Sequence, residues 1–214
     1  MTPSLPPEWR WAGLLLAVGV LGWAARNLPW HKVHGDAEAQ RVFAIAIAIV
    51  IAMRGLNTQS VIGANLHFLG ASILTLMFGA RFALLGLAVA SAAWALLGRV
   101  WLGWGWDFLA NDALPVAVTA AAGAAINRWL PAHLFVYIIG NAFFAAGCAM
   151  LASVLAKALV THWLGGAALA YWVAAIPMAF GEAFFTGGTL AMVVAYRPQW
   201  CASFDDARYL AKRD

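Results

Sequence analysis

The residue best suited to do chemistry in this sequence is His67, an imidazole in a stretch that is otherwise mostly apolar. It belongs to residues 60–70, which read Ser-Val-Ile-Gly-Ala-Asn-Leu-His-Phe-Leu-Gly. Histidine is costly to bury in hydrocarbon unless it faces a cavity, pairs with another polar group or binds an ion. His67 is therefore a candidate ligand, and a histidine that only hydrogen-bonds a neighbouring helix is the alternative.

Three groups of polar residues interrupt apolar sequence and could act together with this imidazole. The first is residues 57–60 (Asn-Thr-Gln-Ser) leading to position 67, the second is residues 104–112, and the third is a single carboxylate in the last apolar segment. Imidazole with carboxylate and amide oxygens is a suitable donor set for a divalent transition metal. The candidate metal ligands are His67, Asn65, Asp107, Asn111, Asp112 and Glu182.

Each candidate has a plainer alternative. Asp107 and Asp112 could be solvated loop acids or helix caps. Glu182 could tie the last helix to its neighbours through a hydrogen bond, although an acid inside an apolar segment usually faces a partner or a water-filled space. The sequence contains no HExxH, paired-cysteine or EF-hand motif, so no strong metal signature supports the set.

The elements that must position these residues are membrane helices. Of 214 residues, 64% are hydrophobic and 10% are charged, with a mean hydropathy of +0.80, whereas soluble domains carry about 25% charged residues. Twelve Trp and twelve Phe suit two interfacial belts. The basic residues are scattered, which argues against nucleic-acid binding. We predict an all-α polytopic protein of the lipid bilayer, with residues 1–214 forming a single domain.

Seven apolar segments predict about seven transmembrane helices. Several are shorter than the roughly 20 residues of a straight span, which predicts buried or broken helices, or helices continued by polar turns, for the second, third and fifth. Their approximate bounds are 11–25, 42–53, 66–78, 82–97, 113–126, 134–159 and 167–196.

Charge predicts the orientation of these spans. Seven spans put the two termini on opposite sides, and the side with more Lys and Arg is expected to face the cytoplasm. One side holds Arg10, Arg54, Arg99 and Lys157. The other holds Arg26, Lys32, Arg41, Arg81, Arg128, Arg197, Arg208, Lys212 and Arg213. We therefore expect a multi-pass protein of the cell inner (plasma) membrane with the N-terminus outside, the C-terminus cytoplasmic and His67 near the outer face.

In this order the motifs resemble those of the CbiM/NikM family, the substrate-binding membrane components of energy-coupling-factor transporters for cobalt and nickel. Residues 63–71 are similar to the family's Gly-x-x-x-His-Leu-x-Gly-Ala element, and residues 181–187 to its Gly-Glu-Gly-x-x-Thr-x ending. Weaker similarities are Pro-Pro-x-Trp at residues 6–9 and the loop at residues 103–111. The resemblance covers most of the chain and implies seven spans with the N-terminus outside.

The resemblance also implies a metal site near the outer surface. In the family a Met-His start supplies amine, backbone nitrogen and imidazole, and the histidine matching His67 completes a planar nitrogen set suited to Ni(II) or Co(II). This chain begins Met1-Thr2-Pro3, so the second-position imidazole is missing and Pro3 has no amide hydrogen to lose. The nitrogen set cannot form unchanged, and a mixed nitrogen and oxygen set would widen the preference towards zinc, iron or cobalt, while copper would require sulfur ligands.

These observations favour a permease that binds a transition metal ion as its substrate, and not an enzyme. Nothing resembles a nucleotide-binding loop, so any ATP coupling must come from separate transmembrane and ATPase subunits of the energy-coupling-factor type, docked on the cytoplasmic side. A permease for a non-metal solute, with Trp101, Trp104 and Trp106 lining its site, is the alternative. An intramembrane enzyme using Glu182 and His67 as acid and base is a third reading.

Overall fold

The structure is a computed structural model that describes residues 6–30, 35–56, 64–98 and 101–209, except for the side chain of Leu102. Within these ranges the chain is helical or lies in short connections, and no β-strand occurs. The α-helices are α1 (Pro7–Arg26), α2 (Ala37–Gly55), α4 (Ala71–Phe78), α5 (Ala80–Gly98), α6 (Trp104–Phe108), α7 (Leu114–Trp129), α8 (Leu134–Val136), α9 (Ala145–Trp163), α10 (Leu169–Tyr196) and α11 (Asp206–Tyr209). The 3-10 turns are Trp101–Gly103 and Pro198–Trp200.

Two pairs of helices are continuous through π-helical turns. Leu109–Ala113 joins α6 to α7, and Tyr137–Phe144 joins α8 to α9. With these turns, four uninterrupted helical stretches among the described residues are long and apolar enough to cross a membrane: Ala80–Gly98, Trp104–Trp129, Leu134–Trp163 and Leu169–Tyr196. The prediction of an all-helical membrane protein is therefore confirmed, although this criterion does not establish the predicted number of seven spans.

The first three apolar segments differ from one another. Helices α1 and α2 have 20 and 19 residues. Helix α2 extends the apolar segment 42–53 through polar residues at both ends, which is one of the alternatives predicted for it. Helix α4 has only eight residues, about 12 Å of rise against a hydrocarbon core of about 30 Å. The expected helix at residues 66–78 is thus broken, because residues 65–70 run as non-helical chain before α4 begins.

Gly70 makes this break possible. Its φ of 64° lies in the left-handed region, and a Cβ there would come 2.7 Å from Val50 Cγ2. A residue with a side chain would therefore meet both backbone strain and a steric clash. Non-helical backbone at membrane depth is tolerated where protein surrounds it, and Leu66 and Leu69 beside Gly70 are buried in the main hydrophobic core.

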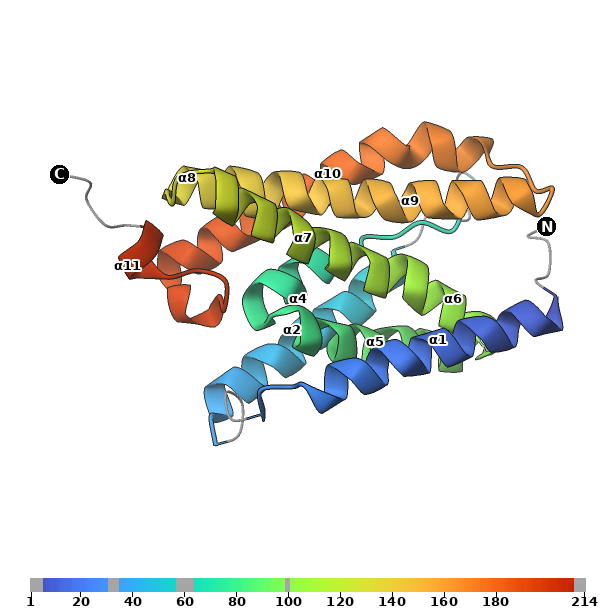
Figure 1. Cartoon of the computed structure of the whole chain (residues 1–214), viewed down its shortest axis with the longest axis horizontal. Coiled ribbons are helices and arrows are strands. Elements are labelled where there is room, and N and C mark those ends of the chain that lie inside the picture. The colour runs from blue at the N-terminus through green and yellow to red at the C-terminus, as the bar shows by residue number, and fades with distance from the viewer. Residues whose placement is uncertain (1–5, 31–34, 57–63, 99–100, 210–214) are drawn as a thin grey trace.

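The long helices run roughly along one axis, which gives the bundle two ends (Figure 1). At one end lie the start of α1, the end of α2, α6 and the end of α9; we call it the site end. At the other lie the ends of α4, α7 and α10, together with α11; we call it the tail end.

Residues 198–209 fold back over the tail end after α10. The amides of Ala202 and Ser203 donate to the carbonyls of Met77 and Leu76, at 2.8 and 3.1 Å. The Ser203 hydroxyl donates to the Leu76 carbonyl at 2.7 Å and contacts the Tyr137 hydroxyl at 2.7 Å. Because these are the last carbonyls of α4, which have no partner inside the helix, the tail completes the hydrogen bonding of that helix end.

Candidate functional site

The imidazole of His67 is buried in the non-helical segment before α4, with 6% of the residue exposed. Its Nδ1 lies 3.0 Å from the carbonyl oxygen of Phe68. A carbonyl can only accept, so Nδ1 carries the hydrogen, and the lone pair of the neutral ring is on Nε2. This is the tautomer in which Nε2 serves as a metal ligand while a hydrogen bond orients the ring.

Glu182 of α10 holds the same segment from the other side. Its Oε2 accepts from the Leu69 amide at 2.9 Å, and its Oε1 accepts from the Gly70 amide at 3.0 Å. The carboxylate is fully buried, so these two charge-assisted bonds replace the water it has lost. Glu182 therefore fixes the backbone two and three residues beyond His67, as a structural hydrogen-bonding role would require.

Aromatic packing reinforces this attachment. The Phe68 ring stacks on Phe185, one turn beyond Glu182, with 6.2 Å between ring centroids. A Cβ at Gly181 would come within 2.9 Å of the Phe68 ring. Gly181 thus lets α10 approach the histidine segment closely enough for the carboxylate to reach it.

A second buried feature is an ion pair between α2 and the π-helical turn Leu109–Ala113. Arg54, in the last turn of α2, is buried and pairs through Nη2 with Oδ1 of the fully buried Asp112. Its Nη1 lies 3.6 Å from Oδ2 of Asp107, whose side chain is 40% exposed. One guanidinium therefore joins two of the three acids predicted as metal ligands.

Asn111 extends this network towards α9. Its Nδ2 donates to Asp107 Oδ1 at 2.7 Å, and its Oδ1 accepts from the Ser153 hydroxyl at 3.3 Å. Single π-helical turns in α-helices are frequent at functional sites, and here the turn carries both Asn111 and Asp112. Within the described part of the chain, Arg54 Nε and Asp112 Oδ2 are buried without a hydrogen-bond partner.

Lys157 of α9 connects the network to the histidine segment. Its Nζ donates to the backbone carbonyl of Asn65 at 3.0 Å. Lys157, Arg54 and Asp107 all lie close enough for their charges to act on the His67 ring. The structure therefore gathers a histidine, two basic residues and two acids at the site end, with the formal charges of the acids and basic residues balanced.

The six predicted ligands do not converge on one point. Among the described residues, no group of three or more His, Cys, Asp or Glu side chains is arranged to hold a metal ion. The side chain of Asn65 is exposed, and Glu182 directs both oxygens at backbone amides. Residues 57–60 and Met1-Thr2-Pro3 lie outside the described residues.

The sequence reasoning treated Arg54 and Lys157 only as charges that set orientation. In the structure both belong to the polar network, and Ser153 joins them from α9. The available signal was their position: Lys157 lies inside the apolar segment 134–159 and Arg54 directly follows the segment 42–53, and a charged residue at membrane depth usually has a buried partner.

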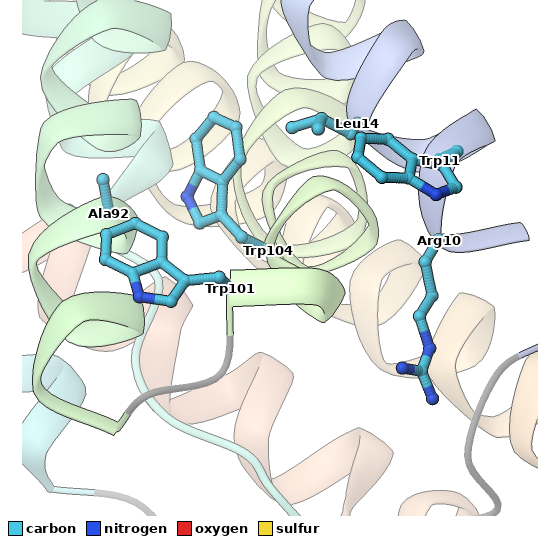
Figure 2. A pocket seen from close by; sticks show the side chains of 6 residues that line it. All are labelled: Arg10, Trp11, Leu14, Ala92, Trp101 and Trp104. Atoms are coloured by element: carbon cyan, nitrogen blue, oxygen red, sulfur yellow. The ribbon is translucent and has the colours of Figure 1, made fainter. Parts of the chain in front are cut away.

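Two of the three tryptophans predicted to line an organic site do line a cavity. Trp101 and Trp104 face Trp11 and Leu14 across it (Figure 2). Trp106 does not line this cavity: its indole nitrogen donates to the Trp9 carbonyl at 2.6 Å.

The alternative of an intramembrane enzyme needs His67 and Glu182 within hydrogen-bond reach of each other. The two side chains have separate hydrogen-bond partners, and no described hydrogen bond joins them.

These features define the class of the protein: it is a helical membrane protein with a buried polar network at one end of its bundle. Residues 2–200 match the family model described as the cobalt uptake substrate-specific transmembrane region, CbiM. The chain therefore belongs to the CbiM family, as its motifs indicated.

A solved structure described as a truncated transition metal transporter has a similar fold. Its TM-score is 0.73 at 19% sequence identity, and the alignment covers 90% of this chain and 96% of that one. Comparison with curated protein sequences gives no significant match. The family is one of uptake components, which fits a transport protein and not an enzyme.

Proposed function

We propose that this protein is the membrane component that binds a transition metal ion for uptake, with His67 Nε2 as a ligand near the outer face. Membership of a cobalt uptake family supports the substrate class. The observation that carries the site is the buried His67 ring, whose Nδ1–H is engaged by the Phe68 carbonyl so that Nε2 has the lone pair. Cobalt or nickel is the expected ion, and zinc or iron would suit added oxygen ligands.

The remaining ligands are assigned by how each carboxylate is engaged. Asp107 is part-exposed; its Oδ1 accepts from Asn111 at 2.7 Å, while its Oδ2 has a weaker contact, 3.6 Å from Arg54, so Oδ2 is the oxygen available to a metal ion. Asp112 is held by Arg54, and Glu182 by two amides. We therefore assign His67 and Asp107 to the metal, Asn111 and Asp112 to positioning Asp107 and Arg54, and Glu182 to positioning His67.

The proposed orientation places the site end outside and the tail end in the cytoplasm. Arg26 ends α1, Arg41 lies in α2 near its start, and Arg128 lies in the last turn of α7. All three are therefore at the tail end, as the positive-inside rule requires of a cytoplasmic face. Transmembrane and ATPase subunits that couple ATP hydrolysis to uptake would then dock at this end, in the inner membrane.

Metal content of purified protein tests this function. We expect mass spectrometry to find close to one equivalent of cobalt or nickel after loading and washing, and little in His67→Ala. His162→Ala is the matched control, because His162 is an exposed histidine at the same end of the bundle. Equal metal content in wild type and His67→Ala would refute the assignment.

A further inference from the structure

A second site lies between α1, α5 and α6 at the site end. The space there is about 340 Å³ and is lined by Arg10, Trp11, Leu14, Ala92, Trp101 and Trp104. Figure 2 shows the indoles of Trp101 and Trp104 on one side and Trp11 with Leu14 on the other, and the side chain of Arg10, the residue before Trp11, extends away from the indoles. The lining is apolar except for one basic side chain, and the volume falls within the range of ligand pockets.

The wall between α1 and α6 is held by backbone contact. Gly105 packs so closely on α1 that a Cβ there would lie 2.4 Å from the carbonyl carbon of Gly13. The Trp106 ring fills the space beside Gly13 and donates to the Trp9 carbonyl at 2.6 Å. No side chain larger than hydrogen fits at this crossing, so the spacing of α1 and α6 is fixed.

The Trp104 wall is also fixed before any ligand binds. Its indole nitrogen donates to the Ser91 hydroxyl of α5 at 3.0 Å, and its ring stacks on Phe108 with 5.6 Å between centroids. Trp11 and Trp101, in contrast, are 59% and 48% exposed. The pocket therefore has a preformed interior and two large aromatic side chains at its opening.

The tryptophans around the pocket are typical of the level at which lipid headgroups meet hydrocarbon. Besides its own indoles, this end of the bundle carries Trp9, which packs against Trp106 and Trp163 at centroid distances of 6.3 and 5.5 Å. Tryptophan gathers at membrane–water interfaces because its ring is amphipathic. A ligand entering here would come from the bilayer with its tail apolar and its head in the interface.

We propose that this pocket binds an anionic phospholipid, with an acyl chain between the tryptophans and the phosphate on Arg10. The apolar lining provides no partner for a polar solute but suits hydrocarbon. Arginine is the side chain best shaped to bind phosphate through paired hydrogen bonds. Phosphatidylglycerol carries only the negative charge of its phosphate, whereas the choline of phosphatidylcholine adds a positive charge that Arg10 repels, so phosphatidylglycerol binds better.

Binding of single lipids to the intact protein, measured by native mass spectrometry from detergent, tests the site. Wild type is expected to bind phosphatidylglycerol about tenfold more tightly than phosphatidylcholine, because the choline cation beside the phosphate opposes the charge of Arg10. Arg10→Gln is expected to remove that preference. Arg26→Gln, which removes the basic residue at the other end of α1, is the matched control and keeps it.

Two further variants locate the acyl chain. Ala92→Phe fills the pocket and is expected to weaken both lipids, and Leu15→Phe, at an exposed position of α1 that does not line the pocket, leaves both unchanged. Trp101→Ala opens the mouth and weakens both lipids without adding volume inside, which covers the case in which Ala92→Phe does not fold. An undiminished preference in Arg10→Gln, or full binding by folded Ala92→Phe or Trp101→Ala, overturns the proposal.

Discussion

The two ends of the bundle stabilise buried polar groups in opposite ways. At the site end, Arg54 and Asp112 pair across two helices and each keeps a buried polar atom without a described partner. At the tail end, the hydroxyls of Tyr137 and Ser203 bond to each other, and Ser203 also bonds to the Leu76 carbonyl. One end keeps a buried ion pair, and the other is closed by neutral contacts.

This difference matches what each end would have to do in uptake. A site that receives an ion needs groups whose hydrogen bonding can change, while a cap over helix ends needs stability. The tail end is stabilised by an aromatic cluster in which Tyr137 packs on Phe204 and Tyr209 at centroid distances of 5.0 and 5.1 Å. Tyr209 also donates to Asn127 of α7 at 2.8 Å.

The largest expected effect comes from breaking the buried ion pair. Asp112→Ala leaves the Arg54 guanidinium buried without its main partner, which costs about 3–5 kcal/mol of folding free energy. Replacing both residues, as in Arg54→Met with Asp112→Leu, is expected to recover most of this loss. Thermal unfolding in detergent measures both, and an Asp112→Ala variant as stable as wild type would contradict the pairing.

A smaller but more specific effect is expected at Glu182. Glu182→Ala removes both acceptors from the Leu69 and Gly70 amides and frees the segment that carries His67. Loss of a residue that orients a ligand typically lowers metal affinity by about 10–100-fold. Glu182→Gln retains one acceptor oxygen and should fall between Glu182→Ala and wild type in metal titrations; affinity unchanged in Glu182→Ala would remove its positioning role.

At the tail end, Ser203→Ala should lower stability while leaving metal binding intact. The variant loses the bond to the Leu76 carbonyl and leaves the Tyr137 hydroxyl with a weaker partner, Cys201 Sγ at 3.7 Å. The expected cost is about 1–2 kcal/mol. Unfolding and metal affinity should both be measured on this variant, and we expect only the stability to fall. A loss of metal affinity in Ser203→Ala would contradict the independence of the two ends.

The smallest effect concerns the reactivity of Cys201. Burial raises the pKa of its thiol to about 11. The group stays protonated at pH 8, and because the thiolate is the nucleophile, alkylation by iodoacetamide should be slow until the pH approaches 11 or the tail is released. The Cys148→Ala background removes the other cysteine. Rapid alkylation of Cys201 at pH 8 in folded protein would mean that the tail does not cover it.

Composition was enough to predict the all-helical membrane fold, and the cost of placing an imidazole in hydrocarbon made His67 a candidate ligand. The arrangement around His67 could not be predicted, because it depends on contacts between distant residues. Glu182 reaches amides 112 and 113 positions away, and its position in the sequence says only that it needs a partner. Nothing local to residues 104–112 showed that Arg54 would pair with the two acids predicted there as metal ligands.

The break before α4 follows the same pattern. The apolar segment 66–78 is short enough to predict a buried or broken helix, but its composition gives no reason for the helix to begin only at Ala71. The reason lies in Val50 of α2, which excludes a side chain at Gly70, and in Glu182, which binds the amides of the non-helical segment. Apolar patterning therefore predicted the segments, while their interruptions depended on tertiary contacts.

The coordination of the bound ion is the property to measure directly. X-ray absorption at the nickel or cobalt edge of the loaded protein should show scattering from an imidazole ring bound through nitrogen. We expect this signal in wild type and in His162→Ala, and its loss in His67→Ala. An imidazole signal that persists in His67→Ala, or a loaded wild-type protein with none, would contradict His67 as the metal ligand.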